Sequence, residues 1–410
     1  MERRAGEDIS VAGIAAGGEG VGRLGDGRAV FVRGALPGER VHVAVTEERN
    51  RFARAELVEV LEAAPARVAA PCGQVAAGCG GCDWQHVAPD AQRELKGQIV
   101  GDALRRIGRI ATPPEIDLGA VLPPGGWRTT VRAVVDDEGR AGFRLHHAHE
   151  ALAVGTGGCL VAHPLVDEVL REGRFPRPVR EVTVRAGAAT GERLVLSAPK
   201  VGDSRVPAGV VLVGADELAG GHRAWIHEVV AGRRWRISAE SFFQGRPDGA
   251  EALVDAVIAA LGEAVRPGAA VADLYSGVGL FAGVIGERTG GRVVAVESNR
   301  SAVADARVNL ADLGAARIVR SDVRKWSPST VDVVVADPSR HGLGGDVVAR
   351  IDATEARALA LVSCDPGALG RDAGLLAGGG WELGSVRLVD LFPHTSHVEV
   401  VTGWFRPSEL

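Results

Sequence analysis

The stretch Ala270-Val-Ala-Asp-Leu-Tyr-Ser-Gly-Val-Gly279 decides the fold class of the second half of the chain. Its first residues read as a short apolar strand, and its two glycines let the backbone turn into a helix and approach a ligand closely. Further short, nearly all-apolar segments follow at the spacing of alternating strands and helices: 293–297, 318–320, 331–337 and 360–364. Strands that are apolar throughout belong in a parallel sheet covered on both faces. We therefore predict a doubly wound α/β domain over residues 237–410.

Acidic residues follow these predicted strands at the edge where open α/β sheets bind ligands. Glu297 ends the second strand, where a carboxylate can hold ribose hydroxyls. The third glycine of a dinucleotide fingerprint is missing after Gly279, and Asp-x-x-x-Gly-x-Gly with a strand-end acid instead resembles the S-adenosylmethionine site of class I methyltransferases. Asp322, after the next strand, is a candidate contact for the adenine, and its alternative role is a helix N-cap. We therefore expect a Rossmann-like methyltransferase domain.

The residues before 237 predict two further units. Residues 1–62 alternate β-branched runs with glycine-rich turns, which predicts a small β-barrel. Strand-like runs also dominate residues 127–236, and a helical pattern covers residues 89–109. We assign residues 63–236 to a β-rich central domain, with the helix at 89–109 as a candidate for packing on the methyltransferase domain.

Composition and charge narrow the class of protein. The chain has 410 residues, of which 46% are hydrophobic and 24% charged, as is typical of a folded globular protein. The net charge is −5, but residues 63–236 carry 22 basic against 19 acidic side chains, so contact with a polyanion is expected mainly there. Residues Met1–Asp8 lack an apolar core, and no run of about 18 apolar residues occurs. We therefore expect a cytoplasmic protein without a signal peptide or membrane contact.

Four motifs, taken in order, make the chain recognisable. They are Phe-Phe-Gln at 242–244, Asp-Pro-Ser-Arg at 337–340, Ser-Cys-Asp-Pro-Gly-Ala-Leu-Gly-Arg-Asp at 363–372 and Phe-Pro-His-Thr-Ser-His-Val-Glu at 392–399. Together they resemble the RNA uracil-C5 methyltransferase family, and the resemblance covers nearly the whole chain. It implies that the N-terminal barrel is an oligonucleotide-fold-like TRAM domain that binds RNA. It also implies an S-adenosylmethionine-dependent enzyme that forms 5-methyluridine.

The resemblance assigns chemical roles to particular residues. Since C5 of uracil is too weak a nucleophile to take a methyl group directly, a thiolate must first attack C6, and Cys364 matches that nucleophile. Glu399 matches the general base that removes the C5 proton. Judged from its apolar segment alone, Cys364 would instead be a small buried hydrophobic residue. The cofactor contacts implied by the resemblance are Gln244, Tyr275, Glu297 and Asp337, in addition to Asp322.

The other four cysteines predict a metal site. Cys72-x6-Cys79-x2-Cys82 with a distant Cys159 supplies four thiolates, the number required by either a structural zinc ion or a 4Fe–4S cluster. Spacing does not choose between them, whereas the resemblance favours the cluster. A radical enzyme is disfavoured, because the cysteine triplet of such enzymes has fewer residues between its first two cysteines than the six between Cys72 and Cys79. We expect the cluster to be architectural, since methyl transfer requires no redox step.

The RNA substrate is inferred from the resemblance. A TRAM domain combined with an iron–sulfur cluster is typical of family members acting on 23S ribosomal RNA, and tRNA is the alternative. The target base must leave its stack to be methylated, so aromatic and basic side chains are candidate RNA contacts. These candidates are Trp84, Phe242, Phe243, Arg128, Arg132, Arg144, Arg233, Arg234 and Arg236. Rival functions are an amino-group RNA methyltransferase and a non-catalytic RNA-binding assembly factor. We expect a monomer.

Overall fold

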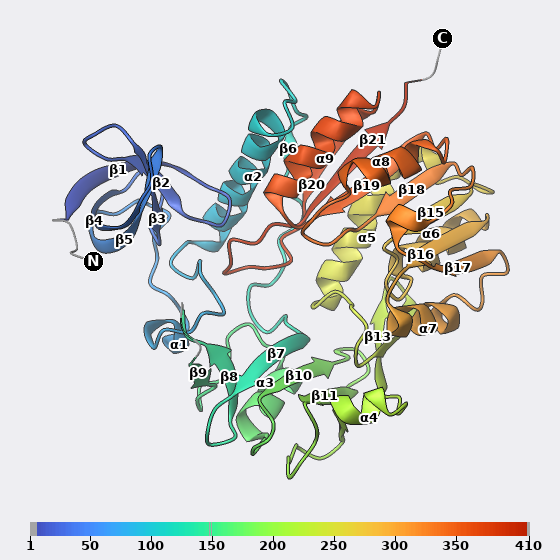
Figure 1. The fold of residues 1–410 in the computed structure, drawn as a ribbon, viewed down its shortest axis with the longest axis horizontal. Helices are drawn as coiled ribbons and strands as arrows, with labels where there is room; N and C mark the ends of the chain where they lie inside the picture. Colours follow the sequence, from blue (N-terminus) through green and yellow to red (C-terminus); the bar gives the residue numbers. More distant parts are fainter. Residues whose placement is uncertain (1–5, 147, 149, 408–410) are drawn as a thin grey trace.

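A computed structural model describes residues 6–146, 148 and 150–407, which form a barrel, a central sheet and a large α/β unit (Figure 1). Most of Met1–Asp8, on which the expectation about a signal peptide rests, lies outside these residues. Across the described residues, every helix is too short or too polar to cross a lipid bilayer.

The N-terminal strands close into a barrel in the order β1-β2-β3-β5-β4. Their bounds are β1 Glu7–Ile14, β2 Gly20–Arg23, β3 Ala29–Arg33, β4 Arg40–Glu48 and β5 Phe52–Glu62. Burial alternates along β3 and the first half of β4, as expected of strands with one face inside a barrel. The inward side chains, such as Val30, Val32, Val41 and Val43, are fully buried. The predicted small β-barrel is therefore confirmed.

The C-terminal unit is built on an eight-stranded sheet in the order β17-β16-β15-β18-β19-β21-β20-β6. Strands β15 to β19 are parallel to one another, whereas β21 runs antiparallel to both β19 and β20. One hydrophobic core lies on each face of the sheet. The strand bounds are β15 Val271–Leu274, β16 Val293–Glu297, β17 Ala316–Arg320, β18 Val333–Ala336, β19 Ala358–Ser363, β20 Glu382–Leu388 and β21 Val400–Phe405. The helices are α5 Pro247–Leu261, α6 Leu280–Thr289, α7 Arg300–Asn309, α8 Gly344–Asp352 and α9 Pro366–Gly378. The predicted doubly wound α/β architecture is confirmed.

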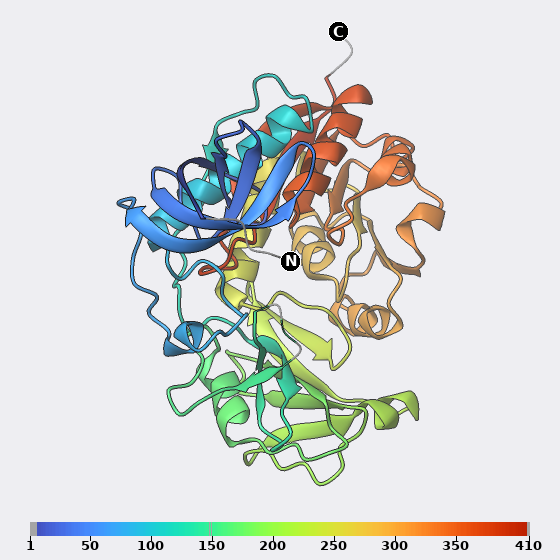
Figure 2. The same cartoon turned by 60° about the vertical axis from the view of Figure 1, so that its left-hand side comes forward.

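One part of the segment 63–236 joins this α/β unit. Helix α2, Pro89–Arg106, packs along α9, where a Cβ added at Gly370 would meet the carbonyl oxygen of Ala103 at 2.7 Å. Strand β6, Ile116–Asp117, pairs in parallel with β20 and completes the edge of the sheet. The sequence did not predict β6, because two residues are too short to show a periodic pattern. Figure 2 shows the barrel beside α2.

The rest of the central segment forms a six-stranded sheet in the order β12-β11-β10-β7-β8-β9. Its strands are β7 Thr130–Val135, β8 Ala141–Arg144, β9 Ala151–Ala153, β10 Glu181–Ala186, β11 Arg193–Ala198 and β12 Val210–Gly214. The short helices are α1 Gly73–Ala76, α3 Pro164–Glu172 and α4 Ala215–Ala219. A separate hairpin, β13 Trp225–Val230 with β14 Arg233–Ser238, leads into the α/β unit. The central sheet lies below the α/β unit in Figure 1, and the cysteine-rich loop, residues 71–82 with α1 inside it, lies beside the sheet.

Candidate active site

The register of the parallel strands brings three predicted site residues to one edge of the sheet. Strand β15 lies between β16 and β18, and the last paired residues of β15 form one row with their partners. The next residues along the three strands are Tyr275, Glu297 and Asp337. The carboxyl ends of parallel strands meet at one edge of the sheet. The pairing of the strands is therefore enough to bring these three residues close together.

The antiparallel register of β19 and β21 accounts for the approach of the two predicted catalytic residues. Ser363 is paired with Val400, so the residues one step beyond the ladder, Cys364 and Glu399, face each other. Glu399 is 5% exposed. Strand β21 runs against its neighbours, and this reversal brings a residue at the start of one strand beside a residue at the end of another.

These edge residues line one large cleft. It is bordered by the cysteine-rich loop, the central sheet and the α/β unit. Among the residues predicted to be catalytic or cofactor-binding, those that line it are Gln244, Tyr275, Glu297, Asp337, Cys364 and Glu399. The amide of Gln244 lies 3.5 Å from a carboxylate oxygen of Asp337. The structure thus brings six of the seven predicted residues together.

Asp322 is the seventh predicted residue, and the structure does not place it in the cleft lining. Its side chain caps the short helix η2, Val323–Lys325, by accepting a hydrogen bond from the backbone amide of Arg324. It also forms an ion pair with the Arg324 guanidinium at 2.6 Å, and this contact lowers the pKa of Asp322 to about 2. Asp322 therefore makes the contacts of a helix N-cap, which was its alternative role. It is still near enough to Tyr275 for its negative charge, after burial, to raise the pKa of that phenol.

The loop after β15 forms a backbone cradle beside Glu297. Gly277 and Gly279 both have left-handed φ values, of 55° and 97°. A Cβ at Gly279 would meet Leu310 at 3.1 Å, whereas a Cβ at Gly277 would find only one backbone oxygen, at 4.0 Å. The backbone amide of Gly277 donates to Glu297 Oε2 at 3.0 Å, and the amide of Asn299 donates to Oε1 at 2.6 Å. The carboxylate is therefore fixed beside open space that a ligand could fill.

Asp337, Glu399 and Cys364 have raised pKa values in the cleft. Burial raises the pKa of Asp337 to about 7. Burial, and after it the charge of Asp337, raises the pKa of Glu399 well above its usual range. Burial and the same two carboxylates raise the pKa of the Cys364 thiol to about 11, although Arg340 acts in the opposite direction. A buried and a half-buried carboxyl group beside a thiol suit proton transfer better than a purely structural role.

Arg340 is a functional candidate that sequence reasoning quoted only as part of a motif. It lines the cleft, and its positive charge opposes the rise in the pKa of Cys364 that burial and the two carboxylates cause. Arg340 therefore favours the thiolate. The feature of the sequence that could have identified Arg340 is its position, three residues beyond Asp337 at the same sheet edge.

The candidate RNA contacts separate into three groups. Phe242 is 68% exposed and lines the cleft, as do Arg128, Arg132 and Arg144. Phe243 and Trp84, at 7% and 1% exposure, are instead part of the hydrophobic cores. The other three arginines form ion pairs with acids away from the cleft: Arg233 with Asp312, Arg234 with Glu192 and Arg236 with Asp305. Stacking is therefore open to Phe242 and not to the two buried aromatic residues.

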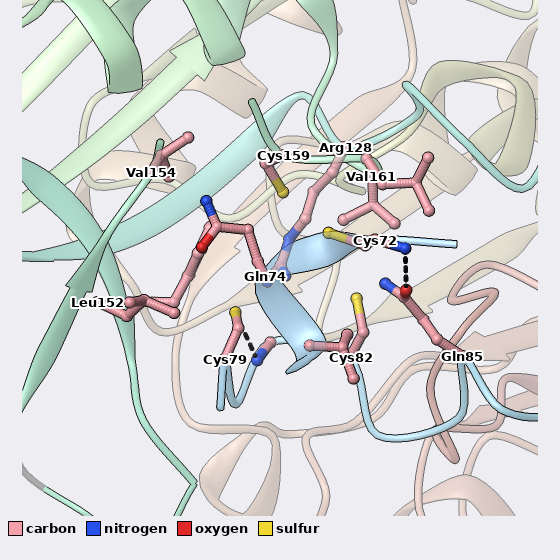
Figure 3. Close-up of a pocket in the computed structure, with 14 residues that line it drawn as sticks. Cys72, Gln74, Cys79, Cys82, Gln85, Arg128, Leu152, Val154, Cys159 and Val161 are labelled. Atoms are coloured by element: carbon pink, nitrogen blue, oxygen red, sulfur yellow. Dashed lines mark hydrogen bonds between the residues drawn. The ribbon is translucent and has the colours of Figure 1, made fainter. Parts of the chain in front are cut away.

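The four remaining cysteines line a single pocket between the cysteine-rich loop and the central sheet (Figure 3). In the figure, the sulfur atoms of Cys72, Cys79, Cys82 and Cys159 point toward the same space. Burial raises the pKa of Cys82 to about 12. Within the described part of the chain, no three His, Cys, Asp or Glu side chains are arranged to hold a metal ion. The four sulfurs thus surround a pocket rather than converge on one point.

Comparison with known proteins identifies the parts of this arrangement. Residues 3–58 match the TRAM domain family. An uncharacterized RNA methyltransferase of Streptomyces avermitilis is 39% identical over 424 aligned residues, which cover 96% of both chains. Another, from Streptomyces coelicolor, is 40% identical and covers 96% of this chain and 91% of that protein.

A solved structure shares the fold of the whole chain. The tRNA (uracil-54, C5)-methyltransferase of Pyrococcus abyssi, in complex with S-adenosyl-L-homocysteine, superimposes with a TM-score of 0.71 at 23% sequence identity. The alignment covers 97% of this chain and 99% of that one. The fold and the cleft define a methyltransferase of class I architecture joined to a TRAM barrel. With its Streptomyces relatives, the chain belongs to the RNA methyltransferase family.

Proposed function

We propose that the protein is an S-adenosylmethionine-dependent enzyme that methylates C5 of uridine in RNA. The observation that carries this proposal is the opposition of Cys364 and Glu399 at the sheet edge, with Asp337 and Gln244 beside them. A thiol and a buried carboxyl group on opposite strands are the two groups that C5 methylation requires, and methylation of an exocyclic amine requires neither. The cradle at Gly277 and Glu297 supports a cofactor site, because its backbone amides and carboxylate suit a nucleoside and amino-acid ligand.

The residues of the cleft divide the reaction into steps. Cys364, after losing its proton, attacks C6 of uracil, and the C5–C6 double-bond electrons move to form an enolate. S-adenosylmethionine, when bound, would supply an electrophilic methyl group to C5 and would leave as S-adenosylhomocysteine. Glu399 as carboxylate then removes the C5 proton, the double bond reforms, and the Cys364 sulfur leaves C6. Arg340 favours the thiolate by its charge, and Gln244 fixes the Asp337 carboxyl group.

A mechanism-based trap tests this proposal. Purified protein and S-adenosylmethionine are mixed with separate ribosomal and transfer RNA fractions that contain 5-fluorouridine. Fluorine at C5 cannot leave as a proton does, so a covalent adduct between Cys364 and RNA should survive denaturation in SDS. We expect this adduct in the parent protein and none in Cys364→Ala, which should still bind the cofactor in calorimetry.

Two results would replace the proposal with a rival function. Methylation of natural RNA without any adduct would indicate an amino-group methyltransferase. Tight RNA binding without methylation would indicate an assembly factor.

For the RNA substrate, we propose 23S ribosomal RNA, with tRNA as the alternative. The combination of a TRAM barrel with four clustered cysteines supports the ribosomal substrate. The named substrate of the Pyrococcus abyssi enzyme is tRNA, but at 23% identity that likeness concerns the fold. The RNA fraction that yields the adduct decides between the two.

We also propose that Cys72, Cys79, Cys82 and Cys159 hold a 4Fe–4S cluster. Four thiols around a pocket suit a cluster, since its ligands stand apart around a core of iron and sulfide. The cluster would link the cysteine-rich loop to the central sheet through Cys159. Protein purified without oxygen should contain about four iron atoms per chain. Cys159→Ser should lose most of them, and an unchanged iron content in that variant would contradict the assignment.

A further inference from the structure

The loop that leads to Glu399 is held by the segment that follows the cysteine-rich loop. This catalytic loop, residues 389–399, connects β20 to β21. One end is fixed by a hydrogen bond of 2.9 Å from the Val389 amide to the Glu399 carbonyl oxygen. Its middle makes a series of hydrogen bonds with residues 83–96, which we call the clamp segment.

Asp83 makes the contact nearest to Glu399. Its carboxylate accepts hydrogen bonds from the Ser396 amide at 3.0 Å and from the Ser396 hydroxyl at 2.6 Å. Ser396 precedes Glu399 by three residues and is itself buried. Hydrogen bonds to a charged acceptor are about twice as strong as neutral ones, so Asp83 fixes both the backbone and the side chain of Ser396.

His394 shows that the loop is held in a conformation it would not adopt freely. Its φ is 66°, in the left-handed region that residues with a Cβ seldom occupy. The Trp84 amide donates to the His394 carbonyl oxygen at 2.9 Å, and the His394 amide donates to the Gln92 side chain at 2.6 Å. These two bonds from the clamp segment stabilise a strained backbone geometry.

A buried ion pair completes the clamp. The Lys96 ammonium group lies 2.6 Å from the Asp390 carboxylate and donates to the Phe392 carbonyl oxygen at 2.9 Å. Lys96 is fully buried. Hydrogen bonds and an ion pair therefore fix the catalytic loop at its start, middle and end. Of the contacts made by the clamp segment, the hydrogen bonds of Asp83 lie nearest in the chain to the carboxyl group of Glu399.

We propose that Asp83 is a positioning residue for Glu399, acting through Ser396 to aim the carboxyl group at the C5 proton. This inference rests on the proposed role of Glu399 as the general base. Because Asp83 directly follows Cys82, the same segment reaches the four-cysteine pocket. The position of the base is thus linked to the ordering of the cysteine-rich loop.

The covalent intermediate supplies a measurement that a general structural defect would not reproduce. If Asp83 positions the base, Asp83→Ala should slow proton removal but leave the attack of Cys364 intact. On natural, unfluorinated RNA, the SDS-resistant adduct should then accumulate while turnover falls roughly 10- to 100-fold. Asp83→Asn keeps one acceptor oxygen for the Ser396 amide and should show a smaller effect. The matched control is Asp90→Asn, an exposed aspartate at the start of α2.

Trapping on 5-fluorouridine RNA separates the possible failures. Equal trapping rates in the parent protein, Asp83→Ala and Asp90→Asn would show that addition and methyl transfer are intact, and iron content is measured in each. If Asp83→Ala loses turnover and trapping to the same extent, or behaves like Asp90→Asn, the positioning role is wrong. If the parent protein itself forms no adduct, the proposed function fails before Asp83 is considered.

Discussion

At the scale of single residues, the cleft brings like charges close together. Glu399 is buried and Asp337 half-buried, and an ionised Asp337 makes ionisation of Glu399 more costly. The pair therefore retains a proton at a pH where exposed carboxyl groups have lost theirs. Proposed catalysis requires the ionised forms of Cys364 and Glu399, so these raised pKa values govern the pH at which the enzyme works.

This argument predicts a shift in the pH–rate profile. The pKa of Asp337 is about 7 and that of Glu399 is also raised, so the rate of turnover, which includes removal of the C5 proton by Glu399, should rise with pH through neutrality. Asp337→Asn removes a negative charge beside Glu399, which lowers the Glu399 pKa and should move the rising limb to lower pH. The rate at which RNA is released free of the covalent adduct, measured at saturating cofactor between about pH 6 and 9, reports this limb. Asp346→Asn, at an exposed position of α8, should leave it unmoved, whereas a shift to higher pH in Asp337→Asn would contradict the argument.

At the scale of elements, α2 is a bridge with buried contacts on more than one side. It packs against α9, while Leu95 and Ile99 contact the cluster that contains Trp84. A helix buried in this way needs no strong amphipathic pattern. Its buried lysine carries a charge that the Asp390 carboxylate, the Phe392 carbonyl oxygen and, more weakly, the charge of Asp83 compensate.

The bridge predicts a large stability effect at Lys96. Lys96→Met leaves the Asp390 carboxylate, which is 7% exposed, buried without its cation. We expect a loss of about 3–5 kcal/mol in the free energy of unfolding, measured by urea denaturation. The double variant Lys96→Met/Asp390→Leu removes both charges and should recover most of the loss. A single variant as stable as the double variant would contradict this account of the pair.

At the scale of the whole molecule, the barrel, the clamp segment and the catalytic loop meet at one point. The Trp84 indole nitrogen donates to the Gly18 carbonyl oxygen at 3.2 Å. A Cβ added at Gly18 would collide with Trp84 and Ser396. The barrel therefore docks directly on the loop that leads to Glu399.

A matched pair of glycine substitutions tests this junction. Gly17 and Gly18 have similar left-handed φ values, of 89° and 81°, but only Gly18 faces neighbouring side chains. Both alanine variants pay the backbone cost, and only Gly18→Ala should loosen the barrel. We expect faster limited proteolysis between the barrel and α2 and weaker RNA binding in Gly18→Ala, with cofactor binding unchanged. Equal effects in the two variants would show that backbone strain alone is responsible.

The sequence by itself determined the α/β architecture, the barrel and the candidate residues at the strand ends. Apolar runs, turn glycines and strand-end acids are local features, so Glu297 and Asp337 could be placed at the sheet edge from short stretches of chain. The role of Cys364 came from the family resemblance, because its apolar segment alone predicts a buried hydrophobic residue. The facing of Cys364 and Glu399 follows from the antiparallel placement of β21, which the motifs imply only through the family resemblance.

Only the tertiary structure decided which contacts these residues make. It placed β6 in the large sheet, gave Asp322 the contacts of a helix cap, and buried Trp84 and Phe243. It also set Asp83 and Lys96 against a loop roughly 300 residues away along the chain. Such contacts leave no periodic signal, because they depend on how separate elements pack rather than on the order of neighbouring residues.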